Sequence, residues 1–127
     1  MTIEEVLRAQ LITGSRTYGS RVYPVRAPQN PTYPFLTYAE ISEVVTHAMG
    51  ADPNVILGRW QVSAFGLTYL ATKAAKNDAI AALSRYRATV SGLEVFDVFK
   101  ELEMDQPFDF EALAYHTVVD FLVMHRN

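Results

Sequence analysis

The three histidines are the side chains of this sequence best suited to acid–base or metal chemistry: His47, His116 and His125. Metal sites and catalytic triads require such residues to converge, but one falls in an expected loop, one in an expected strand and one beside the C-terminus. His116 and Asp120, four residues apart in that strand, would point the same way about 13 Å apart. That separation is too large for a base and its orienting carboxylate, so we predict no catalytic residues.

Glu101, Glu103 and Asp105 alternate in sequence and would share one face of a strand. Such a set could hold a hard cation, but a charged strand at a sheet edge also discourages aggregation, and we favour this second interpretation. The glycines lack a phosphate-binding spacing, and no basic groove accompanies the aromatic residues. We therefore predict no metal, no cofactor and no nucleotide site.

The composition is that of a globular protein, with 127 residues, half of them apolar and a fifth charged. This size suits a single domain spanning residues 1–127 with its own core. The absence of cysteine excludes disulfides and thiolate ligands. A net charge of -3 is of the wrong sign for affinity based on phosphate neutralisation. Glu4 and Glu5 stand where a signal peptide would be basic, so cytosolic synthesis is expected.

The stretch from Leu57 to Tyr86 is the centre of the predicted fold, because an alternating strand runs directly into an alanine-rich helix. Trp60 begins one face of that strand and Arg59 the other. Gly66 ends the strand, and Thr68 can cap the helix that follows. The apolar stripe of this helix is narrow and made of small residues, which lets it lie close to a sheet.

Helices are expected at 2–12 and 68–87. Strands are expected at 21–23, 35–44, 57–65 and 113–123, and a further strand is expected to begin at about residue 93. The proline-rich stretch 27–34 and the stretch 46–54 are expected as surface segments, and 104–110 as a connection.

This element order predicts an α+β fold, an antiparallel β-sheet of about four to five strands with two helices packed on one face. The helices cannot cover both faces of the sheet. An apolar patch on a monomer usually marks a protein partner, so we expect self-association. The expected patch comprises Leu36, Tyr38, Phe65, Ala114, His116, Val118 and Leu122.

Several stretches in order along the chain resemble the tail completion family of long-tailed bacteriophages, also called tail terminator or tail-to-head joining proteins. The segments His47 to Asn54 and Val95 to Phe110 depart from the family pattern. The resembling stretches are Arg21 to Pro24, Ala27 to Gln29, Pro34 to Tyr38 with Ile41 and Ser42, Trp60 to Ala64, the alanine-rich helix, and Val118 to Leu122.

The resemblance implies a structural virion protein and not an enzyme. It would form a homo-oligomeric ring, expected to be a hexamer, at the head-proximal end of the tail tube. Its partners would be the tail tube protein and a head–tail connector or stopper, with DNA passing through the lumen without specific binding. The protein would be assembled in the host cytoplasm and reside in the virion neck. Whether the particle is an infectious phage, a prophage remnant or a gene transfer agent stays open.

Two alternatives remain at this stage: another neck or head-closure ring protein, and a small ligand-binding or enzymatic α+β domain. The interface residues expected for the ring come from the proline-rich segment, the 46–54 loop and the uncovered strand face. They are Pro28, Gln29, Tyr33, Tyr38, His47, Met49, Asp52, Val118 and Leu122.

Overall fold

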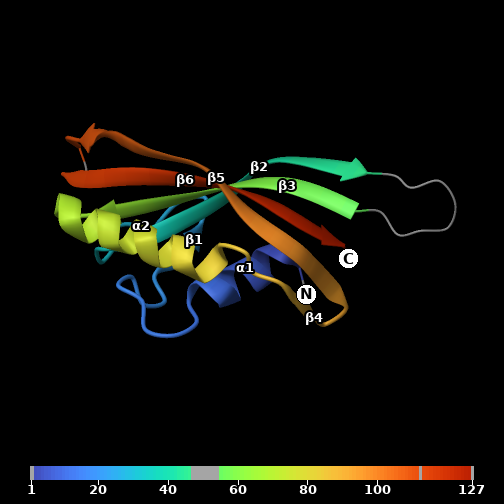
Figure 1. The fold of residues 1–127 in the computed structure, drawn as a ribbon. Coiled ribbons are helices and arrows are strands. Elements are labelled where there is room, and N and C mark those ends of the chain that lie inside the picture. Colours follow the sequence, from blue (N-terminus) through green and yellow to red (C-terminus); the bar gives the residue numbers. More distant parts are fainter. Residues whose placement is uncertain (1, 47–54, 112, 127) are drawn as a thin grey trace, which may run out of the picture.

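The computed structural model describes residues 2–46, 55–111 and 113–126, and it consists mainly of one sheet with two helices (Figure 1). The elements in chain order are α1 (Ile3–Leu11), β1 (Val22–Pro24), β2 (Phe35–Thr46), β3 (Val55–Gly66), α2 (Tyr69–Leu83), β4 (Ala88–Val90), β5 (Leu93–Asp109) and β6 (Ala114–Arg126).

The sheet has six strands in the order β1-β2-β3-β6-β5-β4, and it is mixed because β1 runs parallel to β2. The prediction of four to five antiparallel strands was therefore wrong. The terminal strands β1 and β4 have three residues each, too few to show a periodic pattern. Register shifts in β2 and β5 mark bulges, which bend strands and increase their twist. The result is a curled, half-barrel sheet (Figure 1).

Strand β5 is longer than the sequence indicated, because it continues through the predicted connection at 104–110 as far as Asp109. Pro107 suggested an interruption, since proline cannot donate a ladder hydrogen bond. On its outer side, however, β5 is paired with β4 only over Leu93–Val95. Pro107 therefore lies in an edge segment, where no outer neighbour needs its donor.

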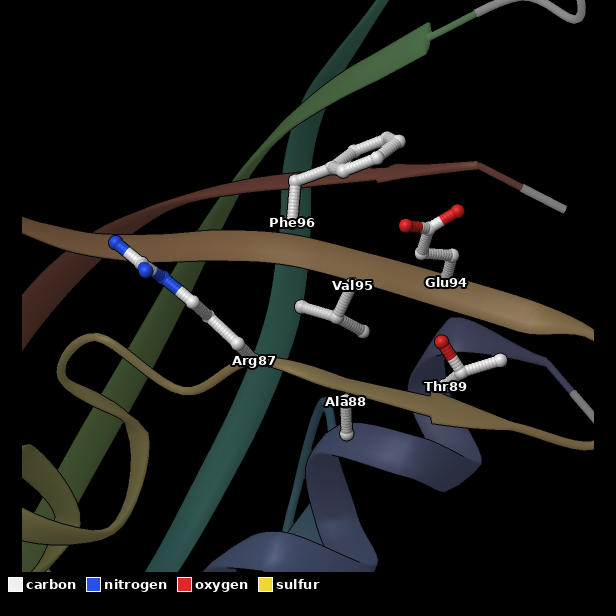
Figure 2. A pocket seen from close by; sticks show the side chains of 6 residues that line it. All are labelled: Arg87, Ala88, Thr89, Glu94, Val95 and Phe96. Atoms are coloured by element: carbon white, nitrogen blue, oxygen red, sulfur yellow. The ribbon is translucent and has the colours of Figure 1, made fainter.

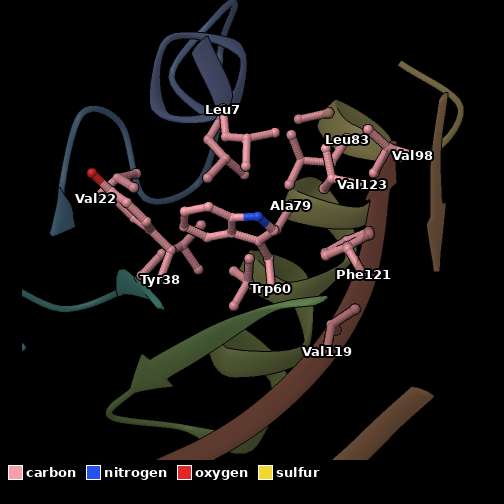
Figure 3. Close-up of a cluster of buried hydrophobic side chains, with 14 of the residues drawn as sticks. Leu7, Val22, Tyr38, Trp60, Ala79, Leu83, Val98, Val119, Phe121 and Val123 are labelled. Atoms are coloured by element: carbon pink, nitrogen blue, oxygen red, sulfur yellow. The ribbon is translucent and has the colours of Figure 1, made fainter. Parts of the chain in front are cut away.

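The alternation predicted for β3 is confirmed, with buried residues at every second position from Gly58 to Gly66. Trp60, 2% exposed, lies among side chains of α1, α2 and the neighbouring strands (Figure 3). Leu36 and Tyr38 also belong to this core, so their placement on the uncovered face was wrong. Alternation showed that β2 has two faces, but it could not show which of them meets the helices.

Helix α2 lies against the sheet through small residues, as its sequence predicted. Ala75 and Ala79 have no exposed surface. At Gly66 an added Cβ would stand 2.5 Å from Thr72 Oγ1, so only glycine permits this approach. The helix begins after the cap Thr68 but ends at Leu83, earlier than expected, and Arg85 has a left-handed φ of 61°.

The segment between α1 and β2 is held by hydrogen bonds from side chains. The Tyr18 hydroxyl donates to the carbonyl oxygen of Leu11 at 2.6 Å, and burial raises the pKa of Tyr18 to about 12. Arg8 Nε donates to the carbonyl of Val22 at 3.1 Å, and Arg21 Nε to that of Pro34 at 2.8 Å. These contacts fix the chain before the proline-rich segment and the end of that segment at Pro34.

Ion pairs join α2 to β5, with Lys73 2.6 Å from Asp105 and Lys76 2.7 Å from Glu103. Glu101 instead pairs with Arg59 at 2.7 Å. The three alternating carboxylates are all exposed, but the prediction that they share one face was wrong, because the register shifts between Lys100 and Leu102.

Replacing Trp60 with alanine is expected to lower the free energy of unfolding by about 3 to 5 kcal/mol, because the change leaves a large cavity in a closed core. Chemical denaturation measures this loss. Leu70→Ala is the matched control: Leu70 is 79% exposed, and a surface change of this kind costs less than about 0.5 kcal/mol. A loss under about 1 kcal/mol for Trp60→Ala would contradict the core assignment.

Acid is expected to weaken the fold through Glu103, whose pKa is lowered from 4.5 to about 2 by hydrogen bonds from Lys100 and Lys76. A lowered carboxyl pKa stabilises the folded state above pH 4.5, and this contribution is lost as the pH falls from 4.5 towards 2. Solvent screening limits it to about 1 kcal/mol.

Urea denaturation of wild type and Glu103→Gln at pH 7 and pH 3 tests this expectation. The difference in stability between the two proteins should be larger at pH 7. An equal difference at both pH values would show that Glu103 contributes nothing through its charge.

Candidate functional site

The sheet face opposite the helices is only partly apolar in this structure. Strand register puts Ser63 beside Val118 and Gln61 beside Asp120 on this face. Arg59 bridges Glu101 at 2.7 Å and Asp120 at 3.7 Å. Val118 is already 4% exposed in the single chain. The uncovered face therefore contains less unprotected apolar surface than the sequence suggested.

An aromatic row crosses one end of this face. The Phe35 and Phe65 rings are stacked with centroids 4.9 Å apart, and Phe65 stacks on His116 at 4.1 Å. Tyr33 meets Phe35 at 5.2 Å. Burial lowers the pKa of His116 below its ordinary value of 6.5, although Asp109 opposes the shift. The neutral imidazole thus serves as a flat stacking partner.

The other histidines considered for acid–base or metal chemistry do not lie together with suitable partners in the described part of the chain. His125 is buried in β6, and His47 lies outside the described residues. Among residues 2–46, 55–111 and 113–126, no group of three or more histidine or acidic side chains is placed to hold a metal ion.

A hollow of about 310 Å³ lies at the β4–β5 hairpin, lined by side chains of the two strands and by Arg87, which comes just before β4 (Figure 2). Its charged groups are engaged elsewhere: Glu94 pairs with Arg126 at 2.6 Å, and Arg87 with Asp97 at 3.0 Å. A ligand site needs polar groups that converge on the ligand, and the paired charges around this hollow do not provide them.

Among the described residues, exposed apolar side chains gather where β3, β5 and β6 meet the start of α2, with the half-buried Phe108 among them. We call the set Leu67, Tyr69, Leu70, Phe108, Phe110, Leu113 and Tyr115 the aromatic tip. Phe110 is 80% exposed and Leu70 79%. Phe108 contacts the rings of Phe110 and Tyr115 at 5.0 and 4.9 Å, and Tyr69 contacts Tyr115 at 6.1 Å. Exposed patches of this kind mark interaction surfaces.

Sequence analysis missed the aromatic tip, although a signal for it was present. Leu67, Tyr69 and Leu70 lie outside the small-residue stripe that buries α2, and Phe108 and Phe110 fall in the stretch assigned as a connection. Apolar residues outside both a helix stripe and a strand face have no core to enter.

The predicted interface residues occupy different parts of the chain. Pro28 and Gln29 are exposed in the proline-rich segment, and Tyr33 is half-buried beside them. Tyr38 is in the core. The others form two groups: Val118 and Leu122 lie on the uncovered face of β6, while His47, Met49 and Asp52 lie outside the described residues.

No protein-family model and no curated protein matches the sequence. Neither described helix is long and apolar enough to cross a membrane. Among solved structures, a chain from the virion of a native gene transfer agent particle is similar, with a TM-score of 0.75 and 15% sequence identity. The similarity covers 98% of this chain and 95% of that one. The two proteins therefore share a fold over nearly their whole lengths.

Proposed function

We propose that this protein is a structural component of a phage-like virion and not an enzyme. The observation that carries the proposal is the end-to-end similarity to a chain of a gene transfer agent particle. Coverage of 98% and 95% means that the likeness extends beyond a shared motif to a whole domain without large additions on either side. Fold alone does not define function, so the surfaces must support the same conclusion.

The exposed surfaces support an assembled protein. Phe110 and Leu70 of the aromatic tip, and Val25 just before the proline-rich segment, are each 75–80% exposed, more than a protein that works alone needs to present. The described residues also offer no three-residue metal cluster, and the charges around the β4–β5 hollow are paired. Binding to other protein subunits is the function that uses what is exposed.

Within the virion, we propose the role of tail terminator. Copies of the chain form a closed ring, a hexamer in our proposal, on the head-proximal end of the tail tube. The ring stops tube growth and contacts a head–tail connector or stopper. When the rotation between neighbouring copies closes the ring, every contact surface is covered by a neighbour and no filament grows.

The charge of the chain suits a ring through which DNA passes. With a net charge of -3, the protein does not gain the counterion-release affinity that would hold the duplex. DNA then slides through the lumen without specific binding. The alternative of a head-closure ring would place the same kind of surface at the portal, and the two roles predict different particle defects.

Particles made without this protein are expected to have overlong tails that fail to join heads, and supplying the wild-type protein should restore normal tails. Electron micrographs give the distribution of tail lengths and the fraction of joined particles. An added purified protein should likewise stop the growth of tail tubes in vitro.

Normal-length tails accompanied by heads that lose their DNA would indicate the head-closure role. Normal particles in the absence of the protein would reject both virion roles.

A further inference from the structure

We propose that copies of this protein associate head to tail, with the aromatic tip of one copy binding residues 24–34 of the next, a segment that contains the proline-rich stretch 27–34. The inference rests on the proposed function in that it assumes assembly, and it identifies the two surfaces that meet. Neither surface is used in the core of the single chain.

The two surfaces have complementary charge. From Val6 to Ala39 the sequence has four arginines and no acidic residue or lysine. Arg26, within the segment, is exposed and makes no ion pair with any described residue. The aromatic tip is bordered by Asp109 and Glu111, and by Asp105, which pairs with Lys73 of the same chain at 2.6 Å. An acidic border around an aromatic surface favours a partner that is apolar and basic.

The segment has the composition that aromatic surfaces bind. Four prolines, at 24, 28, 31 and 34, restrict its backbone, so less conformational entropy is lost when it docks. Val25 is 75% exposed, and Pro28 and Gln29 also face solvent. The hydrogen bond from Arg21 Nε to the carbonyl of Pro34 and the bond from Val25 N to the carbonyl of Tyr38 hold its two ends. Rings and prolines can then meet as preformed surfaces.

The positions of the two surfaces match a head-to-tail contact. The segment joins β1 to β2 at one side of the sheet, whereas the tip surrounds the ends of β5 and β6 and the start of α2 (Figure 1). They lie at the same end of the strands, because Phe35 pairs with Phe65 and Gly66 pairs with Tyr115 in adjacent rows. Two different surfaces of one chain, both at this end of the sheet, can repeat by rotation and close a ring.

The contact must come from a second copy. Three strand spacings separate β2 from β5, a distance of about 15 Å. The ends of the segment are also fixed to its own β1–β2 side. The segment of a single chain is therefore held away from Phe108 and Phe110, the part of its own tip that follows β5.

Sedimentation velocity of the full chain tests the inference by charge exchange. Arg26→Glu and Glu111→Arg should each weaken association by about tenfold or more, and the double variant should recover most of the loss. Phe110→Ser should weaken association as strongly, while Ser84→Glu, an exposed change on neither surface, should associate as wild type does. Unchanged thermal melting confirms that the variants are folded.

Cross-linking gives an independent test, because the natural chain has no cysteine. A mixture of Gln29→Cys and Phe110→Cys proteins should form a disulfide between unlike copies under mild oxidation. Dominant links between two Phe110→Cys copies would show a symmetric tip-to-tip contact and overturn the proposal.

Wild-type protein that stays monomeric at every soluble concentration would also overturn the inference, as would Arg26→Glu and Phe110→Ser variants that associate normally. The proposed function is judged separately, by tail length in particles. Normal association of these variants together with overlong tails in the absence of the protein would reject the contact and retain the terminator role.

Discussion

The close approach of α2 to the sheet is the constraint on which the rest of the structure depends. Gly66 has no room for a Cβ beside Thr72, and Gly58 has none beside the Trp60 indole, where an added Cβ would lie 2.9 Å from Nε1. A helix faced with alanine can therefore lie low on β3 and β6 while one large ring fills the remaining space. Close packing of this kind contributes stability through many small contacts.

That approach also determines what the helix leaves exposed. Because α2 turns its small residues inwards, the large residues of its first turn, Tyr69 and Leu70, have no place in the core and project at the end of the sheet. The hairpin of β5 and β6 adds Phe110 to the same region. The aromatic tip is thus a direct product of the way in which the core is packed. A surface formed on helix and strand ends is also held more rigidly than one on a free loop.

Features of local sequence were predictable, and features set by distant contacts were not. The caps at Thr2 and Thr68 and the alternation around Trp60 follow from neighbouring residues, and the structure contains them. The choice of which β2 face is buried depends on β1 and α1, so the assignment of Tyr38 failed. The extension of β5 past Pro107 depends on the absence of an outer neighbour there, which the local sequence does not show.

The candidate surfaces were predictable to a similar degree. The composition of the proline-rich segment predicted a surface position, and its residues 27–34 are exposed or half-buried, with none fully buried. The aromatic tip combines two stretches that are far apart in the sequence, 67–70 and 108–115, and only the fold brings Leu67 and Phe110 to one place. The 46–54 loop lies outside the described residues, so its predicted contacts stay predictions.

Most charged side chains of β5 form ion pairs within the same chain, whereas the arginines before β2 form none with the described residues. In β5, Asp97, Glu101, Glu103 and Asp105 each have an arginine or lysine of the same chain within 3.0 Å. This neutralisation lets a long, bulged strand with an open outer side stay in the sheet, and it removes much of the repulsion that protects such an edge. Within residues 2–46, 55–111 and 113–126, the arginines before β2 instead have carbonyl partners, as Arg21 has, or no ion-pair partner, as Arg26 shows. The positive charge of Arg26, beside rigid and exposed prolines, is available to a neighbouring molecule. Acidic residues around an apolar surface are the environment that compensates such a charge.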